Sequence, residues 1–212
     1  VLAVWDGPAR GVLSAERVAL NFLQRLSAVA TSTRRYVDCL AGTGAKVYDT
    51  RKTTPAWRDL EKYAVRCGGG HNHRRGLFDA VLIKDNHLAI LAITEGRDPI
   101  EALDRELTRV RPYLGEDGFI MLEVDTLEQF DMALTMPVDI VLLDNMTLDE
   151  LCEARRRRDA AGLAGMVELE ASGGITLDTL RNVAQTGVER ISVGALTHSA
   201  GTVDIALDIE VD

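Results

Sequence analysis

The stretch VDIVLLDNMTLDE, residues 138–150, shows the unit from which the fold class can be predicted. Its first part is an almost uninterrupted apolar run of strand length, which is typical of a parallel sheet whose two faces are both covered. Thr147, with Glu150 three residues later, forms a capping box and predicts the start of a helix. Asp144 and Asn145 lie between the two, where the strand ends. A strand, a polar turn and a helix therefore follow one another within a short segment.

The same alternation runs along the rest of the chain. We expect strands at KVYDT (46–50), AVLIKD (80–85), GFIMLEV (118–124), VDIVLLD (138–144), MVELEAS (166–172), RISVG (190–194) and VDIALDI (203–209). We expect helices from Ser14 to just before Gly42, over 54–64, and after the capping residues Asp98, Thr126, Thr147 and Thr176. The pattern predicts one α/β domain over residues 1–212, with 1–13 as a lead-in. The predicted fold is an incomplete (β/α) barrel of about seven strands, and a doubly wound sheet is the alternative.

The charge of the chain excludes some functions and favours another. A net charge of -9 argues against general nucleic-acid binding, yet residues 46–87 hold nine Lys and Arg against five Asp and Glu. A basic island in an acidic chain favours a small anionic ligand, although a solvated charged face has the same composition. No apolar run is long enough for a membrane helix, and residues 1–10 lack the pattern of a signal peptide. The three widely spaced cysteines do not suggest a disulfide framework, so the expected location is the cytoplasm.

Polar residues stand at the carboxyl end of every expected strand up to residue 194. These strand ends hold the segments 49–52, 84–85, 123–125, 144–145 and 172–174, together with Gly194. The carboxyl ends of parallel strands form the face that carries the active site in barrels and open α/β sheets. A shared pocket at this face is therefore expected.

The expected pocket contains groups of both charge signs. Its cationic side chains, which could hold an anion by charge-assisted hydrogen bonds, are Arg51, Lys52, His73, Arg74 and Lys84. Two carboxylates, Glu123 and Asp144, end apolar strands, where an unpaired charge is costly. They could hold Mg²⁺ together with a substrate phosphate, or form salt bridges with Lys84 or Lys52.

Two glycine-containing loops complete the expected site. In ASGGITLDTL (171–180) the glycines allow close approach of the backbone, and the helix after Thr176 directs free N–H groups at a phosphate. In CGGGHNHRRG (67–76) the glycines stand before His73 and Arg74, which predicts an anion-binding loop. A metal site made of His71, His73, Asp85 and His87 is a weaker alternative, because cationic side chains surround it and the spacing matches no known ligand pattern. A nuclease of the His-Asn-His type is weaker still.

Several long motifs resemble quinolinate phosphoribosyltransferases, the carboxylating nicotinate-nucleotide pyrophosphorylases. The matching segments, in order between about Gly7 and Asp208, are YDTRKTTP (48–55), EKYAVRCGGGHNHRRGLFDAVLIKDNH (61–87), LEVDT (122–126), LLDN (142–145), ASGGIT (171–176) and ISVGALTHSA (191–200). The resemblance implies that quinolinate reacts with 5-phosphoribosyl-1-pyrophosphate and Mg²⁺ to give nicotinate mononucleotide, pyrophosphate and CO₂ for NAD synthesis. It also implies a homodimer or higher homo-oligomer, without nucleic-acid or membrane partners.

The resemblance implies a role for individual residues. Those holding the quinolinate carboxylates would be Thr50, Arg51, Lys52, His73, Arg74 and Lys84. Glu123 and Asp144 would face the ribose and the Mg²⁺-pyrophosphate, and with Lys52 and Lys84 they form the expected catalytic set. The groups binding the 5-phosphate would be Ser172, Gly173, Gly174, Val193, Gly194 and Ala195.

The family usually carries an amino-terminal domain that covers the barrel of the partner subunit, and we expect it to be missing from this chain. The expectation is that the chain alone binds anions but turns over slowly. Two alternatives remain open. One is a related phosphoribosyltransferase for another acid, of the type found in molybdenum-transport operons, and the other is a non-catalytic anion-binding barrel.

Overall fold

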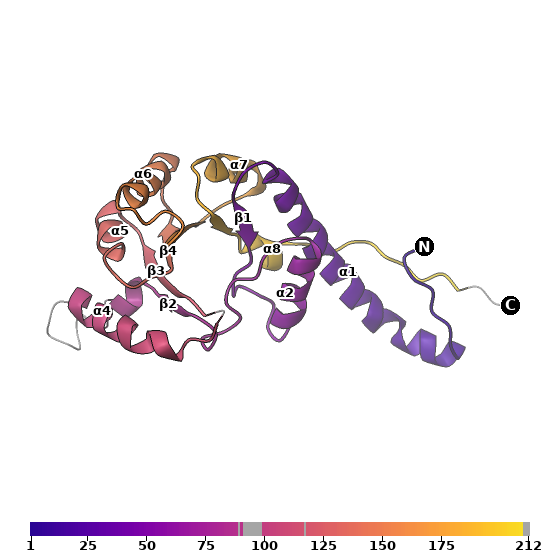
Figure 1. Cartoon of the computed structure of the whole chain (residues 1–212). Helices are drawn as coiled ribbons and strands as arrows, with labels where there is room; N and C mark the ends of the chain where they lie inside the picture. Colours follow the sequence, from indigo (N-terminus) through magenta and orange to yellow (C-terminus); the bar gives the residue numbers. More distant parts are fainter. Residues whose placement is uncertain (89, 91–98, 117, 210–212) are drawn as a thin grey trace.

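The computed structural model describes residues 1–88, 90, 99–116 and 118–209 and contains one parallel sheet surrounded by helices (Figure 1). The strands are β1 Lys46–Tyr48, β2 Val81–Ile83, β3 Ile120–Val124, β4 Ile140–Asp144, β5 Glu168–Ser172 and β6 Arg190–Ser192. The helices are α1 Ala9–Cys39, α2 Arg58–Cys67, α4 Pro99–Val110, α5 Leu127–Ala133, α6 Leu148–Ala160, α7 Leu177–Gln185 and the short α8 Ala195–His198, with a 3₁₀ turn at Arg111–Tyr113. No helix of the described residues combines the length and apolar character that a bilayer crossing requires.

The strand order confirms an incomplete barrel. The order across the sheet is β1-β6-β5-β4-β3-β2, and every neighbouring pair is parallel. β1 and β2 end the sheet on either side of the opening, and beyond β1 a single bridge joins Tyr48 to His71. A doubly wound sheet is excluded, because its strand order would reverse in the middle and place helices on both faces. Here the helices lie outside and the strand ends surround a common centre (Figure 1).

The two faces of the sheet bury different kinds of residue. The outer face packs on the helices through a large core that includes Val141, Leu143 and Leu169. The inner face has a smaller apolar cluster of Met121, Ile140 and Leu142, with Leu82 and Phe119 against it. Both faces are thus apolar over part of their area, which explains the nearly continuous apolar strand sequences.

The expected seventh strand is wrong. Residues 203–209 form no strand, and they run beside α1 instead. The N–H of Val203 donates to the Gln24 carbonyl oxygen at 3.2 Å, and Gln24 Nε2 donates to the Ile205 carbonyl oxygen at 2.9 Å. In this run apolar residues alternate with Asp204 and Asp208, so only one side of the segment can be covered. Within the described residues, the sheet therefore has six strands.

Several expected helix starts also shift. α1 begins at Ala9 behind Pro8, five residues before the expected start at Ser14. α2 begins at Arg58 and not at Thr54, because residues 54–57 form a turn, in which the N–H of Trp57 donates to the Thr54 carbonyl oxygen at 3.0 Å. The cap expected at Asp98 lies outside the described residues.

The capping boxes are partly confirmed. The box of Thr147 and Glu150 is present in both directions. At the start of α5, Thr126 accepts from the Gln129 N–H at 3.3 Å, but the Gln129 side chain accepts from Asp125. The capping at residues 147–150 fixes α6 directly behind Asp144 and Asn145, and so helps to position the carboxyl end of β4.

Candidate anion-binding active site

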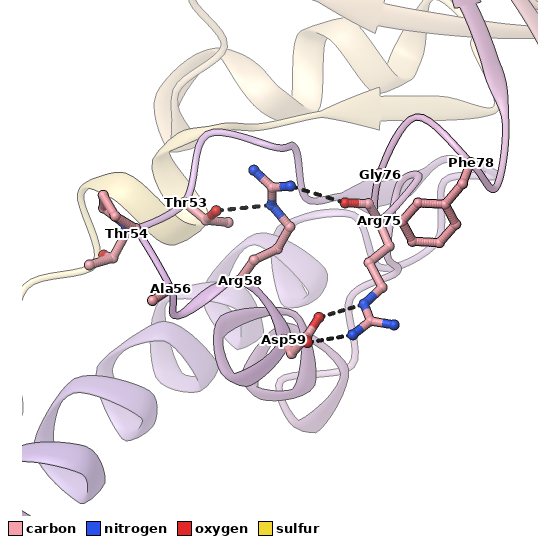
Figure 2. A pocket seen from close by; sticks show the side chains of 9 residues that line it. Thr53, Thr54, Ala56, Arg58, Asp59, Arg75, Gly76 and Phe78 are labelled. Carbon is pink, nitrogen blue, oxygen red and sulfur yellow. Dashed lines mark hydrogen bonds and ion pairs between the residues drawn. The ribbon is translucent and has the colours of Figure 1, made fainter.

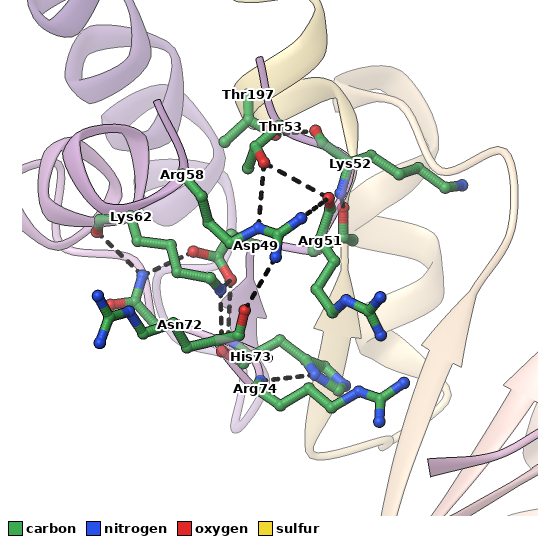
Figure 3. Close-up of polar contacts among 12 residues, drawn as sticks. Asp49, Arg51, Lys52, Thr53, Arg58, Lys62, Asn72, His73, Arg74 and Thr197 are labelled. Carbon is green, nitrogen blue, oxygen red and sulfur yellow. Dashed lines mark hydrogen bonds and ion pairs between the residues drawn. The ribbon is translucent and has the colours of Figure 1, made fainter. Parts of the chain in front are cut away.

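A buried carboxylate, Asp49, joins the end of β1 to the HNHR loop. Asp49 has no exposed surface and accepts hydrogen bonds from Lys62 Nζ at 2.5 Å, Asn72 Nδ2 at 2.6 Å and the His73 N–H at 2.8 Å (Figure 3). Lys62 Nζ also donates to the His73 carbonyl oxygen at 2.9 Å. Burial raises the pKa of the Asp49 carboxyl, and the Lys62 charge and the hydrogen bonds oppose this rise. This network holds the loop at the sheet edge.

The side chains of His73 and Arg74 are buried within that loop. His73 Nδ1 accepts from the Arg74 N–H at 2.8 Å, and His73 Nε2 lies 3.4 Å from Glu170 Oε1. Arg74 Nη1 donates to the Ala80 carbonyl oxygen at 3.3 Å. Its Nε is buried and has no partner among the described residues. Burial lowers the pKa of the Arg74 guanidinium, and the nearby charge of Arg51 lowers it further.

Arg51 and Lys52 lie on an exposed loop whose backbone and Thr53 side chain accept hydrogen bonds from Arg58. Arg58 donates through Nη2 to the Arg51 carbonyl oxygen at 3.2 Å and through Nε to Thr53 Oγ1 at 3.2 Å. Thr50 Oγ1 accepts from the Lys52 N–H at 3.1 Å. Figure 3 shows the Arg51 and Arg74 guanidinium groups on the same side of the loop. The structure thus brings together two of the predicted anion-binding arginines.

The predicted acidic residues face the same side of the sheet. Glu123 is paired in register with Leu142, and Asp144 lies two residues further along β4, so both side chains project from the inner face. Glu123 forms an ion pair with Lys84, and Asp144 accepts from Asn145 Nδ2 at 2.7 Å. A salt bridge is therefore present at Glu123, while Asp144 has no lysine partner among the recorded ion pairs of the described residues.

The turn between β5 and α7 has the close packing expected of a phosphate-binding loop. The Asn145 N–H donates to the Ser172 carbonyl oxygen at 3.0 Å, which joins the ends of β4 and β5. Gly173 has a φ of 97°, and a Cβ there would lie 2.2 Å from Asn145 Oδ1. A hollow of about 200 Å³ lies beside the turn and is lined by Ser172, Gly173, Gly174, Ile175 and Thr179, among others. Only glycine fits at residue 173.

The predicted residues Val193, Gly194 and Ala195 lie beside the Lys52 loop. The Val193 N–H donates to the Tyr48 carbonyl oxygen at 2.9 Å. Thr197 Oγ1 donates to the Lys52 carbonyl oxygen at 2.7 Å. A Cβ on Gly194 would lie 3.2 Å from the Lys52 side chain. The loops after β1 and β6 are therefore tied together, as one side of the candidate site.

A larger hollow lies beside the segment that follows Lys52. It has a volume of about 600 Å³ and is lined by Thr53, Thr54, Pro55, Ala56, Arg58, Asp59, Arg75, Gly76 and Phe78 (Figure 2). Arg75 Nε donates to Asp59 Oδ1 at 2.6 Å within it, and Arg58 Nη1 donates to the Arg75 carbonyl oxygen at 3.2 Å. None of the residues predicted to bind substrate lines this hollow.

The metal-site alternative is wrong for the part of the chain that the structure describes. No three His, Cys, Asp or Glu side chains gather there in a way that could hold a metal ion. His87 Nδ1 accepts from the Lys84 N–H at 2.9 Å, and the His71 ring packs 5.2 Å from the Tyr48 ring. His71 and His87 thus make separate contacts with neighbouring residues.

Sequence reasoning missed the buried residues that support the site. These are Glu61, Lys62, Glu170 and Arg190. Charged residues in or next to apolar runs, such as Glu170 in ELEAS, were the available signal. Their partners come from distant parts of the chain, so the sequence did not reveal them.

A known protein family matches most of the chain. Residues 29–208 match the family profile of the quinolinate phosphoribosyl transferase C-terminal domain. The chain belongs to the quinolinate phosphoribosyltransferase family. A probable carboxylating nicotinate-nucleotide pyrophosphorylase of Bacillus subtilis is 43% identical over 209 residues, covering 99% of this chain and 68% of that protein. The corresponding protein of Mycobacterium leprae is 46% identical over 201 residues, covering 95% and 66%.

Solved structures of this family have the same fold. The nicotinate-nucleotide pyrophosphorylase of Ehrlichia chaffeensis superposes with a TM-score of 0.78 at 41% identity, over 94% of this chain and 67% of that one. The Streptococcus pyogenes NadC structure gives 0.78 at 40% identity, over 93% and 65%. The chain thus spans about two thirds of the length of these members of the quinolinate phosphoribosyltransferase family.

Proposed function

We propose that this chain provides the phosphoribosyl-transfer site of a quinolinate phosphoribosyltransferase. The observation that carries the proposal is the convergence of Arg51 and Arg74 on one side of the loop, in a chain 43% identical to a carboxylating nicotinate-nucleotide pyrophosphorylase. Two guanidinium groups match the two carboxylates of quinolinate, because each offers a planar pair of donors. The preference for a dicarboxylate over a simple acid follows from this pair.

The proposed positions of the two substrates follow from where the predicted residues lie. The region that receives quinolinate contains Thr50, Arg51, Lys52, His73, Arg74 and Lys84, and Lys84 is paired with Glu123. The glycine turn after Ser172 and the residues Val193, Gly194 and Ala195 receive the 5-phosphate of phosphoribosyl pyrophosphate. Support for the phosphate position is the tight turn at Gly173, with α7 starting behind it.

Magnesium fits the site only together with the phosphate substrate. Glu123 and Asp144 supply carboxylate oxygens on one face of the sheet, and no third acidic or histidine ligand joins them among the described residues. Mg²⁺ commonly takes one or two carboxylates and completes its shell with phosphate oxygens and water. Bound there, Mg²⁺ would neutralise charge on the pyrophosphate leaving group.

The proposed reaction has two parts. The quinolinate ring nitrogen forms a bond to C1 of the ribose, and the bond from C1 to the pyrophosphate oxygen breaks, so that pyrophosphate leaves with the electron pair. Positive charge that develops on the ribose is stabilised by Glu123 or Asp144. The carboxylate next to the ring nitrogen then leaves as CO₂, its electron pair remains on the ring carbon, and a proton from water completes nicotinate mononucleotide. Lys84 and Lys52 balance the phosphate charge.

Calorimetry with quinolinate, followed by a CO₂-release assay with phosphoribosyl pyrophosphate and Mg²⁺, tests the proposal. We expect saturable quinolinate binding and CO₂ release matched by nicotinate mononucleotide. Transfer to another acid without quinolinate binding would identify a phosphoribosyltransferase of different specificity. Quinolinate binding without product, even with the longer polypeptide typical of the relatives, would identify a non-catalytic anion-binding barrel.

We also propose that the protein works as a homodimer or a higher homo-oligomer. Large apolar side chains are exposed near the candidate site, including Leu77 at 74% and Phe78 at 78% relative exposure. Exposed apolar groups of this kind are common where another subunit packs. Light scattering coupled to gel filtration should give at least twice the monomer mass, and a monomer at working concentration would contradict this proposal.

A reducing compartment, the cytoplasm, is the proposed location. The support is that Cys39, Cys67 and Cys152 are all free thiols. Cell fractionation with an antibody should find the protein in the cytoplasmic fraction, and recovery from an oxidising compartment would refute the proposal.

A further inference from the structure

Glu170 is a charged residue placed where an unpaired charge is most costly. It lies in the middle of β5, faces the inside of the barrel and has no exposed surface. Arg190, its register partner on β6, donates through Nε to Glu170 Oε2 at 2.8 Å. The Arg190 guanidinium also lies 3.7 Å from the centre of the Tyr48 ring. Arg190 therefore accounts for one of the two carboxylate oxygens.

The second carboxylate oxygen of Glu170 faces His73. Glu170 Oε1 is buried and makes no hydrogen bond of normal geometry among the described residues, and His73 Nε2 lies 3.4 Å away. Burial acts to raise the pKa of the Glu170 carboxyl, but the contacts with His73 and Arg190 lower it overall. The ion pair with Arg190 fits an ionised carboxylate, and a hydrogen on His73 Nε2 is the group that its second oxygen can attract.

The other nitrogen of the His73 ring determines where the ring proton lies. His73 Nδ1 accepts from the Arg74 N–H at 2.8 Å, so Nδ1 carries a lone pair and no hydrogen. Turning the ring over would place a C–H group against that buried amide, which needs an acceptor. The ring is also held edge-on to Phe119, with 5.7 Å between ring centres. The contacts of the His73 ring therefore fit a proton on Nε2, directed at Glu170.

We propose that Glu170 is a positioning residue of the anion site, acting through His73 on Arg74. The carboxylate fixes the His73 tautomer, and the lone pair on Nδ1 then fixes the backbone N–H of Arg74. Nδ1 accepts from the Arg74 N–H and Nε2 faces Glu170, so the His73 ring links the carboxylate to the backbone of Arg74. Arg74 remains the group that binds, because its buried Nε has no protein partner among the described residues. This inference rests on the proposed function in using quinolinate as the probe.

The chain offers a matched control on the same strand. Glu168 lies two residues before Glu170 on β5 and also contacts Arg190, with Arg190 Nη1 at 3.2 Å from Glu168 Oε2. Glu168 is half-exposed and has no recorded contact with His73. E168Q and E170Q therefore remove the same charge from two carboxylates around one arginine, but only E170Q changes the environment of His73.

Nitrogen NMR of histidine-labelled protein and quinolinate calorimetry test the proposal together. The His73 signal, assigned by its loss in H73Q, should show the neutral Nε2–H tautomer near neutral pH. E170Q should change that signal and weaken quinolinate binding about tenfold, the effect of weakening one charge-assisted contact of Arg74. E168Q should leave the His73 signal and the affinity at their wild-type values.

Each contrary result has a separate meaning. A doubly protonated His73, or one protonated on Nδ1, would overturn the proposal from the wild-type spectrum alone, even if E170Q failed to fold. Equal quinolinate affinity of folded E170Q and wild type would also overturn it. Failure of the wild type to bind quinolinate would instead refute the proposed function, and the ring-nitrogen spectrum would still decide the role of Glu170.

Discussion

Lys62 and Asp49 show how much of the site depends on one buried pair. Both side chains are almost completely covered, and their contact also holds the His73 backbone. Removing the charge of Asp49 leaves the Lys62 ammonium buried without its counterion. Breaking a buried pair from one side costs about 3–5 kcal/mol. We expect D49N to lose this much unfolding free energy in urea titrations.

D59N is the control for that measurement, because Asp59 pairs with Arg75 on the surface. Their side chains are 61% and 59% exposed, and surface pairs contribute about 0–1 kcal/mol. Equal destabilisation by D49N and D59N would show that the Asp49 network has no special importance for the fold.

Arg74 and Arg75 are neighbours in sequence but lie in opposite environments. Substituting each in turn therefore distinguishes a direct contact with the ligand from the general effect of positive charge. Arg74 is 7% exposed and faces the site, whereas Arg75 is engaged with Asp59. Each charge-assisted hydrogen bond contributes roughly 1.5–3 kcal/mol. R74A should therefore weaken quinolinate binding by about tenfold or more, measured by calorimetry. R75A should bind nearly as the wild type, and similar losses in the two variants would point to a diffuse electrostatic effect.

His71 should make the stability of the fold sensitive to mild acid. Burial lowers the pKa of its ring, and the charges of Lys46 and Arg190 lower it further. The unfolded chain, with an ordinary histidine pKa of about 6.5, takes up this proton before the folded chain does. Stability from this group is therefore full above about pH 6.5 and declines as the pH falls towards the lowered folded pKa.

The measurement compares urea midpoints of the wild type and H71F at a series of pH values. H71F keeps an aromatic ring beside Tyr48 but cannot titrate, so its midpoint should fall less between neutral pH and pH ~5, above the range where ordinary carboxyl groups titrate. Parallel curves for the two proteins would mean that His71 does not contribute to the acid sensitivity.

The residues that could be predicted from sequence are those with a local signal. Arg51 and the glycines after Ser172 stand next to recognisable strand ends, Arg74 follows a run of glycines, and the structure places Arg51 and Arg74 on the same side of their loop. Glu170 and Lys62 could not be assigned a role, because their partners His73 and Asp49 come from other elements. A buried charge indicates that a partner exists, but its identity depends on the tertiary fold.

At the scale of elements, the turn from β5 to α7 tests whether backbone shape or composition makes the phosphate site. Gly173 and Gly174 both have positive φ, 97° and 58°, which costs a residue with a side chain roughly 1–2 kcal/mol. Only at Gly173 would a Cβ overlap Asn145, since nothing lies within 4 Å of one at Gly174. G173A should therefore lose both more unfolding free energy and more phosphate affinity than G174A.

Urea titration and calorimetry with inorganic phosphate measure the two effects. Loss of affinity in both variants to the same degree would show that left-handed backbone conformation alone matters. Unchanged phosphate affinity in G173A would remove this turn from the proposed binding site.

Strands and helix starts could be predicted where neighbouring residues in the sequence carry the signal. Continuous apolar runs gave six strands at nearly correct positions, and Thr147 with Glu150 correctly marked the start of α6. The run 203–209 was assigned to a strand on hydrophobicity alone, but its partner is α1. Strand pairing depends on a free sheet edge at the right place, which no local pattern contains.

For the whole molecule, the unequal burial of α1 predicts unequal mobility. No residue of this helix is buried before Leu20, whereas Ala28, Val29, Thr33 and Tyr36 are buried further along. Figure 1 shows the first half of α1 extending away from the barrel. Because helices gain most of their stability from packing, amides in residues 9–19 should exchange with deuterium faster than those in residues 28–39. Uniform protection along α1 would indicate that another surface covers its first half.

The pairing of β1 with β6 has a consequence for how the molecule is made. Strands β2 to β5 each pair with a neighbour that follows soon in the sequence, so they can assemble while the ribosome is still adding residues. β1 has to wait, since its strand partner begins at Arg190. Arg51 and Lys52 follow β1 in the chain, and Thr197 Oγ1 donates a hydrogen bond to the Lys52 carbonyl oxygen. The candidate site is thus the last part of the sheet to form during synthesis, and a chain interrupted before Arg190 would contain β2 to β5 but would lack the strand that pairs with β1 beside Arg51 and Lys52.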